Sequence, residues 1–286
     1  MPWATPPADA AADLREQFDV EKELAARLLA ASAAEREGLY SEVYDELFRR
    51  LPHQPQLAQR GDKAAQAELV RLQAALLEGF LEPDTHFVEV GSGDCALALH
   101  LASRLRRVTV VEASREIVAG LELPANFELS EAKGSRCDLG AGTADLAFSC
   151  HFIEHLHPDD AASHAREMHR ILRPGGHYLV VTPNRLYGPH DVSRYFAEEA
   201  QGLHLREYTH ADLARLLRRA GFEQVRRLRG IGVRPEERAV WPAAIAETTA
   251  GVLPTALRRA LLGRYGRGTS PPFRPLEQVM LVARRG

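Results

Sequence analysis

The sequence FVEVGSGDCALAL, residues 87–99, decides the fold of this chain. It contains a strand pattern, then a glycine-rich turn, then the start of a helical pattern. Gly91 permits a sharp turn and Gly93 lets the backbone approach a ligand, because neither residue has a Cβ atom. The first amides of the following helix have no partners within that helix. The stretch therefore predicts a ligand-binding turn between a strand and a helix.

A carboxylate at the end of the next strand adds to this signal. Glu112 closes the strand pattern RVTVVE nineteen residues after Gly93, and a carboxylate there can accept hydrogen bonds from both hydroxyls of a ribose. Strand, turn, helix and acid in this register predict a ligand that contains a nucleoside. The alternative is a structural turn followed by a glutamate that faces solvent.

Strand patterns alternate with helical patterns through the rest of the chain. Strands are expected at residues 86–90, 107–114, 126–130, 144–150, 177–183, 224–232 and 277–285, and helices at 95–105, 114–121, 159–172 and 209–222. This alternation predicts a mostly parallel sheet with helices on both faces. Residues 1–80 have helical spacing, and residues 233–275 form an insertion before the last strand.

Length and composition limit the class of protein. The chain has 286 residues and a net charge of −3, which suits one domain with additions. We expect a helical extension or lid at residues 1–80 and the main domain at 81–286. No apolar run has the length of a membrane span, and the N-terminus lacks a signal-peptide pattern. The near-neutral balance and the lack of a long basic surface argue against nucleic acid as a partner.

The cysteines predict a reducing compartment. Cys95, Cys137 and Cys150 form an odd set without CxxC spacing, and disulfides are rare in the cytosol. We therefore expect a cytoplasmic protein.

Glu89 helps to choose between cofactors. The loop alone fits the dinucleotide pattern, which leaves an NAD(P)-dependent oxidoreductase as the alternative function. Glu89 stands two residues before Gly91, where dinucleotide folds usually have an apolar residue. A carboxylate at this position would repel a negatively charged pyrophosphate and attract a cationic ligand. It could also accept hydrogen bonds that hold the loop. A protein that binds the cofactor without turnover is a third possibility.

Four segments together resemble a known family. They are EVGSGD at residues 89–94, VVEAS at 110–114, TADLAFSCHFIEHL at 143–156 and LRPGGHYLVVTPN at 172–184. In this order and spacing they resemble the motifs of class I S-adenosylmethionine-dependent methyltransferases, in particular the branch of the ubiquinone and menaquinone methylases. The resemblance covers residues 84–231.

The resemblance implies a Rossmann-like, seven-stranded sheet with an antiparallel last strand, and S-adenosylmethionine as cofactor. It places Glu112 at the ribose and assigns further cofactor contacts to Glu89, Gly91, Ser92, Gly93, Asp94, Ala113, Leu139 and Cys150. Ala113 and Leu139 would lie beside the adenine. The family commonly has an acidic residue soon after the third strand, but Lys133 and Gly134 occupy this position here, and Asp138 lies further along.

The segment HFIEH, residues 151–155, carries the candidate catalytic histidines. A hydroxyl acceptor must lose a proton, and histidine is suited to take it. His155 is the first candidate and His151 the second; alternatively, the acceptor arrives ionised and the histidines are structural. HFIEH also matches the H-x-x-E-H pattern of some zinc proteases. Pro158 leaves no room for a long metal-bearing helix and a third ligand is not evident, so no metal is expected.

The long segment at residues 182–210 predicts the acceptor site, because loops beyond the carboxyl ends of strands form binding sites in such sheets. His190 and Asp191 could form an acid–base pair there, and Arg194 could hold an anionic group. Alternatively, Asp191 is the N-cap of a helix. Tyr40 and Tyr44, four residues apart on the N-terminal helix, would cover the pocket or simply pack.

The predicted function is methyl transfer from S-adenosylmethionine to a hydroxyl, in preference to a carbon or an amine. The acceptor would be a small molecule or a sugar-containing metabolite.

Overall fold

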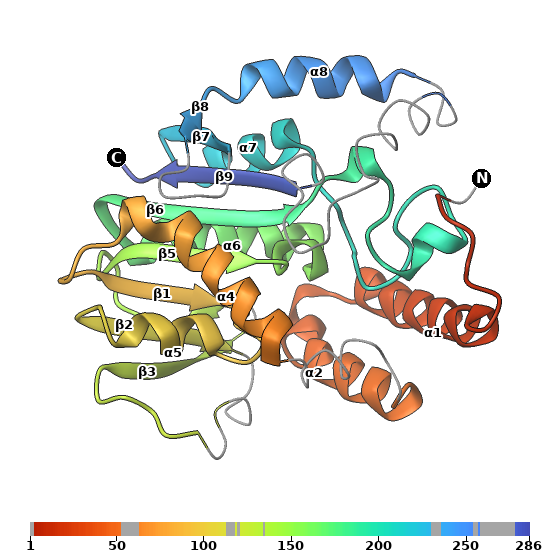
Figure 1. Cartoon of the computed structure of the whole chain (residues 1–286), viewed down its shortest axis with the longest axis horizontal. Helices are drawn as coiled ribbons and strands as arrows, with labels where there is room; N and C mark the ends of the chain where they lie inside the picture. The colour runs from red at the N-terminus through yellow and green to blue at the C-terminus, as the bar shows by residue number, and fades with distance from the viewer. Residues whose placement is uncertain are drawn as a thin grey trace.

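The computed structural model describes residues 3–52, 63–112, 118, 121–133, 135–229, 236–253, 257 and 278–286. Within these ranges, a single sheet contains nine strands in the order β4-β3-β2-β1-β5-β6-β9-β7-β8 (Figure 1). The strands are β1 His86–Val90, β2 Arg107–Glu112, β3 Phe127–Lys133, β4 Arg136–Cys137, β5 Ala144–Cys150, β6 Leu172–Pro183, β7 Gln224–Arg229, β8 Glu236–Arg238 and β9 Gln278–Arg284.

The strand pairings confirm the predicted fold class. The pairs β1–β2, β2–β3, β1–β5 and β5–β6 are parallel. The last strand, β9, is antiparallel to both β6 and β7. All seven predicted strands are therefore present, and the antiparallel last strand is confirmed.

Two short strands were not predicted from the sequence. β4 pairs with β3 and β8 pairs with β7, in both cases antiparallel and at an edge of the sheet. They are two and three residues long, which is too short for a strand period to appear in the sequence.

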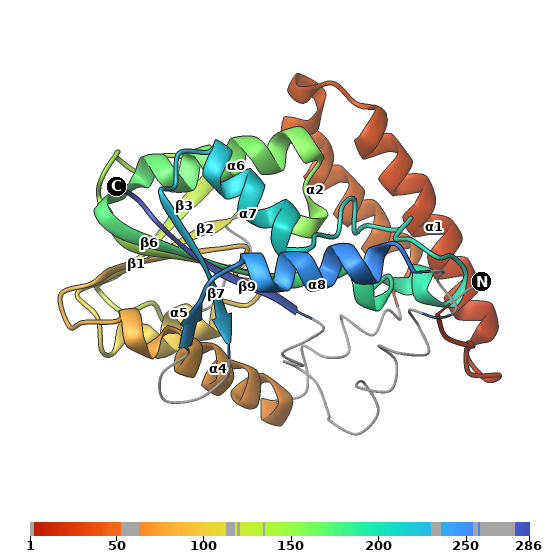
Figure 2. The same ribbon diagram turned by 90° about the horizontal axis from the view of Figure 1, so that it is seen from above.

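Helices cover both faces of the sheet (Figure 2). α4 Lys63–Leu77 and α5 Ala96–Ala102 lie on one face, and α6 Pro158–Ile171 and α7 His210–Arg219 on the other. Alternate residues of β1 enter the two cores, because successive side chains of a strand point to opposite faces. Phe87 packs with the α4 and α5 side, and Val88 with the α6 and α7 side. All five residues of β1 are buried.

The predicted N-terminal helical segment is divided into two helices, α1 Ala11–Ala30 and α2 Ala33–Arg50. A capping box begins α2: the Ser32 side chain accepts from the Glu35 amide, and the Glu35 carboxylate accepts from the Ser32 amide at 2.8 Å. The two helices share a small core of Val20, Leu24, Leu28, Val43 and Leu47. In Figure 1 they lie beyond the ends to which the β1 and β5 arrows point.

A buried ion pair attaches α2 to the main domain. Arg36, only 3% exposed, donates from Nε to Oδ2 of Asp160 at 2.7 Å and from Nη2 to Oδ1 at 2.9 Å. Asp160 belongs to the first turn of α6, which follows the carboxyl end of β5. The N-terminal helices are thus held beside the edge of the sheet where the parallel strands end.

Part of the predicted insertion at residues 233–275 is described. It contains β8 and the helix α8 Trp241–Gly251, and most of its other residues lie outside the described ranges. The same is true of most of the helix predicted at 114–121. No described helix combines the length and the apolar character that crossing a membrane would require. Four 3₁₀ helices complete the described chain: η1 Glu78–Phe80, η3 Ile153–His155, η4 Arg185–Tyr187 and η5 Val192–Tyr195.

Candidate active site

The glycine-rich loop between β1 and α5 adopts the predicted sharp turn. Gly91 and Gly93 both have a φ of 68°, a conformation that is favourable only for glycine. At Gly91 a Cβ atom would also overlap the ring of Phe152. Phe152 follows β5, so this contact brings the segment after β5 directly against the glycine-rich loop.

Glu112, the carboxylate at the end of β2, lies against the same loop. Its Oε1 accepts the Gly93 amide at 3.2 Å and the Ser92 hydroxyl at 3.5 Å. Asp94 uses Oδ1 to accept the Ala96 amide at 2.9 Å, in the first turn of α5. The structure therefore brings together Ser92, Gly93, Asp94 and Glu112 around the turn.

Glu89 is buried below this turn. Its side chain is 5% exposed, and Oε2 accepts the Ala98 amide of α5 at 3.1 Å. Burial, together with the nearby charges of Asp94 and Glu112, raises the pKa of Glu89 to about 8, although the Ala98 hydrogen bond opposes this shift. Glu89 thus holds the loop and helix by a hydrogen bond, and its carboxyl is placed where a cation would stabilise the charged form.

The other residues predicted to bind the cofactor are less closely grouped. Leu139 packs against the core on the α6 and α7 side, and Cys150 against the core on the α4 and α5 side. Burial raises the pKa of the Cys150 thiol to about 12, so this thiol is not a nucleophile at neutral pH. Ala113 lies outside the described residues, and Asp138 is exposed.

His151 begins a sharp turn after β5. Its φ is 52°, which is unusual for a residue other than glycine and is often found at functional sites. The turn leads into η3, whose Glu154 is fully buried. His151 Nδ1 lies 3.2 Å from Glu154 Oε1, and the Thr182 hydroxyl donates to Glu154 Oε2 at 2.9 Å. Burial alone would raise the pKa of Glu154, but the His151 hydrogen bond and nearby imidazoles lower it to about 2.

His155 is oriented by a backbone carbonyl. Its Nδ1 lies 3.0 Å from the Leu203 oxygen, and since a carbonyl can only accept, Nδ1 carries the proton and Nε2 has a free lone pair. Burial, together with the neighbouring His204, lowers the pKa of His155 to about 4. His155 is therefore neutral at pH 7, and its Nε2 carries no proton.

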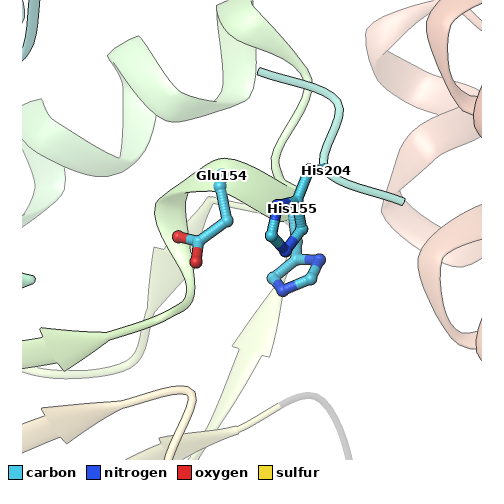
Figure 3. Close-up of side chains that lie close together, drawn as sticks. All are labelled: Glu154, His155 and His204. Atoms are coloured by element: carbon cyan, nitrogen blue, oxygen red, sulfur yellow. The ribbon is translucent and has the colours of Figure 1, made fainter. Parts of the chain in front are cut away.

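His204 completes a cluster that the sequence did not predict. Its Nδ1 lies 2.8 Å from Glu207 Oε1, and its ring meets that of His155 at 4.9 Å and 81° (Figure 3). Burial alone would lower the pKa of His204, but the Glu207 carboxylate raises it to about 9. The side-chain donor atoms of Glu154, His155 and His204 lie within 4.8 Å of one another.

The predicted acceptor residues have mixed positions. Asp191 is the N-cap of η5, and it accepts the amides of Ser193 at 2.9 Å and Gly202 at 3.1 Å. These bonds favour the capping alternative over an acid–base pair with His190. The His190 amide donates to Glu207 Oε1 at 2.7 Å. The same carboxylate oxygen binds His204, so His190 lies next to the partner of a cluster residue. Arg194 stacks on the neighbouring Tyr195 ring at 5.7 Å.

The two tyrosines of α2 differ in their surroundings. Tyr40 donates to Asp160 Oδ2 and accepts the His157 amide, both at 2.8 Å, so its hydroxyl joins α2 to α6. The Tyr44 ring instead lies edge-on to His155 at 6.4 Å. The structure thus brings Tyr44, but not the hydroxyl of Tyr40, to the histidine cluster.

Comparison with known proteins identifies the domain that carries this site. Residues 88–180 match the family described as Methyltransferase domain. A protein of Mycolicibacterium smegmatis described as an S-adenosylmethionine-dependent methyltransferase is 31% identical over 137 residues, which cover 48% of this chain and 51% of that protein. The match thus spans about half the length of this curated relative.

Solved structures agree on the fold. A chain of the Haloferax volcanii complex between the Trm112 methyltransferase activator and a methyltransferase has a TM-score of 0.52 at 15% identity, covering 80% of this chain and 95% of that chain. The S-adenosylmethionine-dependent methyltransferase SibL has a TM-score of 0.50 at 19% identity, covering 97% of this chain and 70% of that chain. Residues 88–180 therefore match a methyltransferase domain, and the solved structures share the fold of the described chain, which includes the glycine-rich loop and the antiparallel last strand.

Proposed function

We propose that the protein transfers the methyl group of S-adenosylmethionine to a hydroxyl of a small-molecule or sugar-containing acceptor. One observation carries this proposal: the free Nε2 of His155 lies on the segment that packs, through Phe152, against the glycine-rich loop. A proton-accepting group is therefore held beside the expected cofactor site.

The residues around the loop suit this cofactor. S-adenosylmethionine supplies a methyl group on a positively charged sulfur. The buried Glu89 carboxyl, whose pKa is raised to about 8, would become a more stable carboxylate beside such a charge. The Glu112 carboxylate, already against the Gly93 amide at 3.2 Å, is placed to accept the ribose hydroxyls.

The chain contributes alignment and proton removal. Direct displacement needs the acceptor oxygen in line behind the methyl group, and holding it there supplies much of the rate. The Nε2 of His155 can take the proton of the acceptor hydroxyl directly. The Leu203 carbonyl keeps this imidazole in position.

Side chains from two other segments lie against His155, which favours a small acceptor over a nucleic acid. α2 brings Tyr44 to His155, and the 184–209 segment brings His204. Because α2 and this segment each place a side chain against His155, an acceptor of limited size fits better than a long polymer.

Isothermal titration with S-adenosylhomocysteine and with NADH tests the cofactor. We expect micromolar binding of S-adenosylhomocysteine and none of NADH; the opposite result would support the oxidoreductase alternative and overturn the proposal. Release of S-adenosylhomocysteine in the presence of a panel of hydroxylated metabolites would then identify the acceptor. His155→Ala should lower that rate, whereas His100→Ala, at an exposed position of α5, is the matched control.

A further inference from the structure

The cluster of Glu154, His155 and His204 has the composition of a metal site. One carboxylate oxygen and two imidazole nitrogens converge within 4.8 Å (Figure 3). Glu154 is fully buried, and the His204 side chain is 12% exposed. Each of the three side chains already has a hydrogen-bond partner, so a shared ion would use the lone pairs that these bonds leave.

In both imidazoles, Nδ1 is held by a hydrogen bond to a group outside the cluster. His155 uses Nδ1 to donate to the Leu203 carbonyl at 3.0 Å, and His204 uses Nδ1 toward the Glu207 carboxylate at 2.8 Å. This leaves Nε2 of each ring for a ligand. Histidines that bind metals almost always make such a second hydrogen bond to a carbonyl or a carboxylate.

The carboxylate is also oriented. The Thr182 hydroxyl donates to Glu154 Oε2 at 2.9 Å, and the Arg206 amide donates to the Glu154 carbonyl at 3.1 Å. The second contact ties η3 to the segment that carries His204, so the carboxylate and both imidazoles are held by one set of bonds.

We propose that Glu154, His155 and His204 bind a divalent transition-metal ion such as Zn²⁺. Two imidazoles and one carboxylate suit zinc and related ions, whereas Mg²⁺ and Ca²⁺ prefer oxygen ligands. Three protein ligands leave at least one position open, as in catalytic zinc sites. The sequence did not predict this site, because the third ligand comes from a loop 49 residues after His155 and not from a helix.

The ion would activate the acceptor hydroxyl for methyl transfer. This role of the ion rests on the proposed function. The acceptor hydroxyl would bind the open position and release its proton to solvent, because a bound cation lowers the pKa of a hydroxyl. The oxygen then forms a bond to the methyl carbon while the carbon–sulfur bond breaks, and its electron pair stays on sulfur. With the ion bound, His155 is a ligand and not the base.

Zinc binding to the full-length protein tests the inference. Chelator-treated protein is titrated with Zn²⁺ by calorimetry, and Co²⁺ loading is followed by its visible absorption. We expect about one ion per chain with a micromolar or tighter Kd. Glu154→Gln, which keeps the shape of the side chain, and His204→Ala should each weaken binding at least tenfold, and Glu207→Gln about 10- to 100-fold. His100→Ala should bind like the wild type.

Binding of S-adenosylhomocysteine to the same preparations separates the two proposals and confirms that each variant is folded. Protein that binds S-adenosylhomocysteine but not Zn²⁺ would overturn the metal site and leave the methyltransferase proposal standing. Zn²⁺ binding that Glu154→Gln and His204→Ala both leave unchanged would likewise overturn the site. Zinc binding without binding of S-adenosylhomocysteine would support the site and contradict the proposed function.

Discussion

Replacing Glu89 by glutamine should stabilise the protein and weaken its cofactor binding. The Glu89 carboxyl is 5% exposed and accepts the Ala98 amide at 3.1 Å. An amide oxygen can accept the same hydrogen bond, so Glu89→Gln keeps the shape and the contact. The variant removes only the possibility of a buried negative charge.

The pH dependence of this effect has a definite sign. The pKa of Glu89 is raised to about 8 in the folded protein from an ordinary value of 4.5. Between these values the folded state retains a proton that the unfolded state has lost, so stability falls as pH rises. Each pKa unit corresponds to about 1.4 kcal/mol. From pH 5 to pH 8 the wild type should therefore lose on the order of 2 to 4 kcal/mol that Glu89→Gln retains.

Urea unfolding at pH 5, 6, 7 and 8 measures the difference. Glu122→Gln, at an exposed position, is the control for loss of a carboxyl and should follow the wild type. Parallel stability profiles for the wild type and Glu89→Gln would refute the reasoning, because they would show that no buried proton is lost in this range.

The same variant tests the role of Glu89 toward the cofactor. S-adenosylmethionine carries a positive sulfur and S-adenosylhomocysteine does not. If the carboxylate faces that charge, Glu89→Gln should weaken S-adenosylmethionine about tenfold more than S-adenosylhomocysteine, as charge-assisted contacts are worth about 1.5 to 3 kcal/mol. Equal losses for both ligands would assign Glu89 to holding α5 alone.

Three further substitutions test the loop and the N-terminal helices. Glu112→Ala should weaken S-adenosylhomocysteine binding by about 1 to 3 kcal/mol; an unchanged affinity in calorimetry would exclude a ribose contact. Gly91→Ala puts a Cβ against the Phe152 ring at a positive φ and should cost about 2 to 4 kcal/mol in urea unfolding, whereas Gly38→Ala, at an open position inside α2, should not destabilise. Tyr40→Phe removes two hydrogen bonds to α6 and should lower stability by about 1 to 3 kcal/mol, with wild-type binding of S-adenosylhomocysteine.

The fold could be predicted because its main signals are local. β1 is buried along its whole length, and its apolar residues mark it in the sequence despite His86 and Glu89. The turn after it needs glycine for steric reasons that are visible in the residues themselves. The division between α1 and α2 was missed, although the pattern Ser32-x-x-Glu35 is a capping-box signature.

The site could be predicted only in part, because tertiary contacts decide its polar partners. The turn residues and Glu112 lie within one strand–helix–strand unit, and the structure brings them together. His204 reaches His155 across a loop without a period, which no sequence pattern signals. Whether Asp191 caps a helix or pairs with His190 depended on whether η5 forms. Its bonds to two backbone amides show that it is the N-cap of η5.

Distant segments hold the loop that carries His204. Trp3 packs on Gly188 so closely that a Cβ there would overlap the indole ring, and the indole donates to the Glu198 carbonyl at 3.1 Å. Farther along the loop, the Leu203 amide donates to Glu21 of α1 at 3.4 Å. The position of the loop therefore depends on the N-terminal helices as well as on its own residues.

This arrangement separates the two binding tasks of the proposed enzyme. The glycine-rich loop and its carboxylates lie within residues 88–180, the segment that matches the methyltransferase domain. His155 receives its orientation from the Leu203 carbonyl, and His204 belongs to the loop itself, so the acceptor side depends on residues outside that segment. Because α1 and α2 hold this loop and are joined to α6 by a buried ion pair, changes in them should alter acceptor binding while leaving cofactor binding intact.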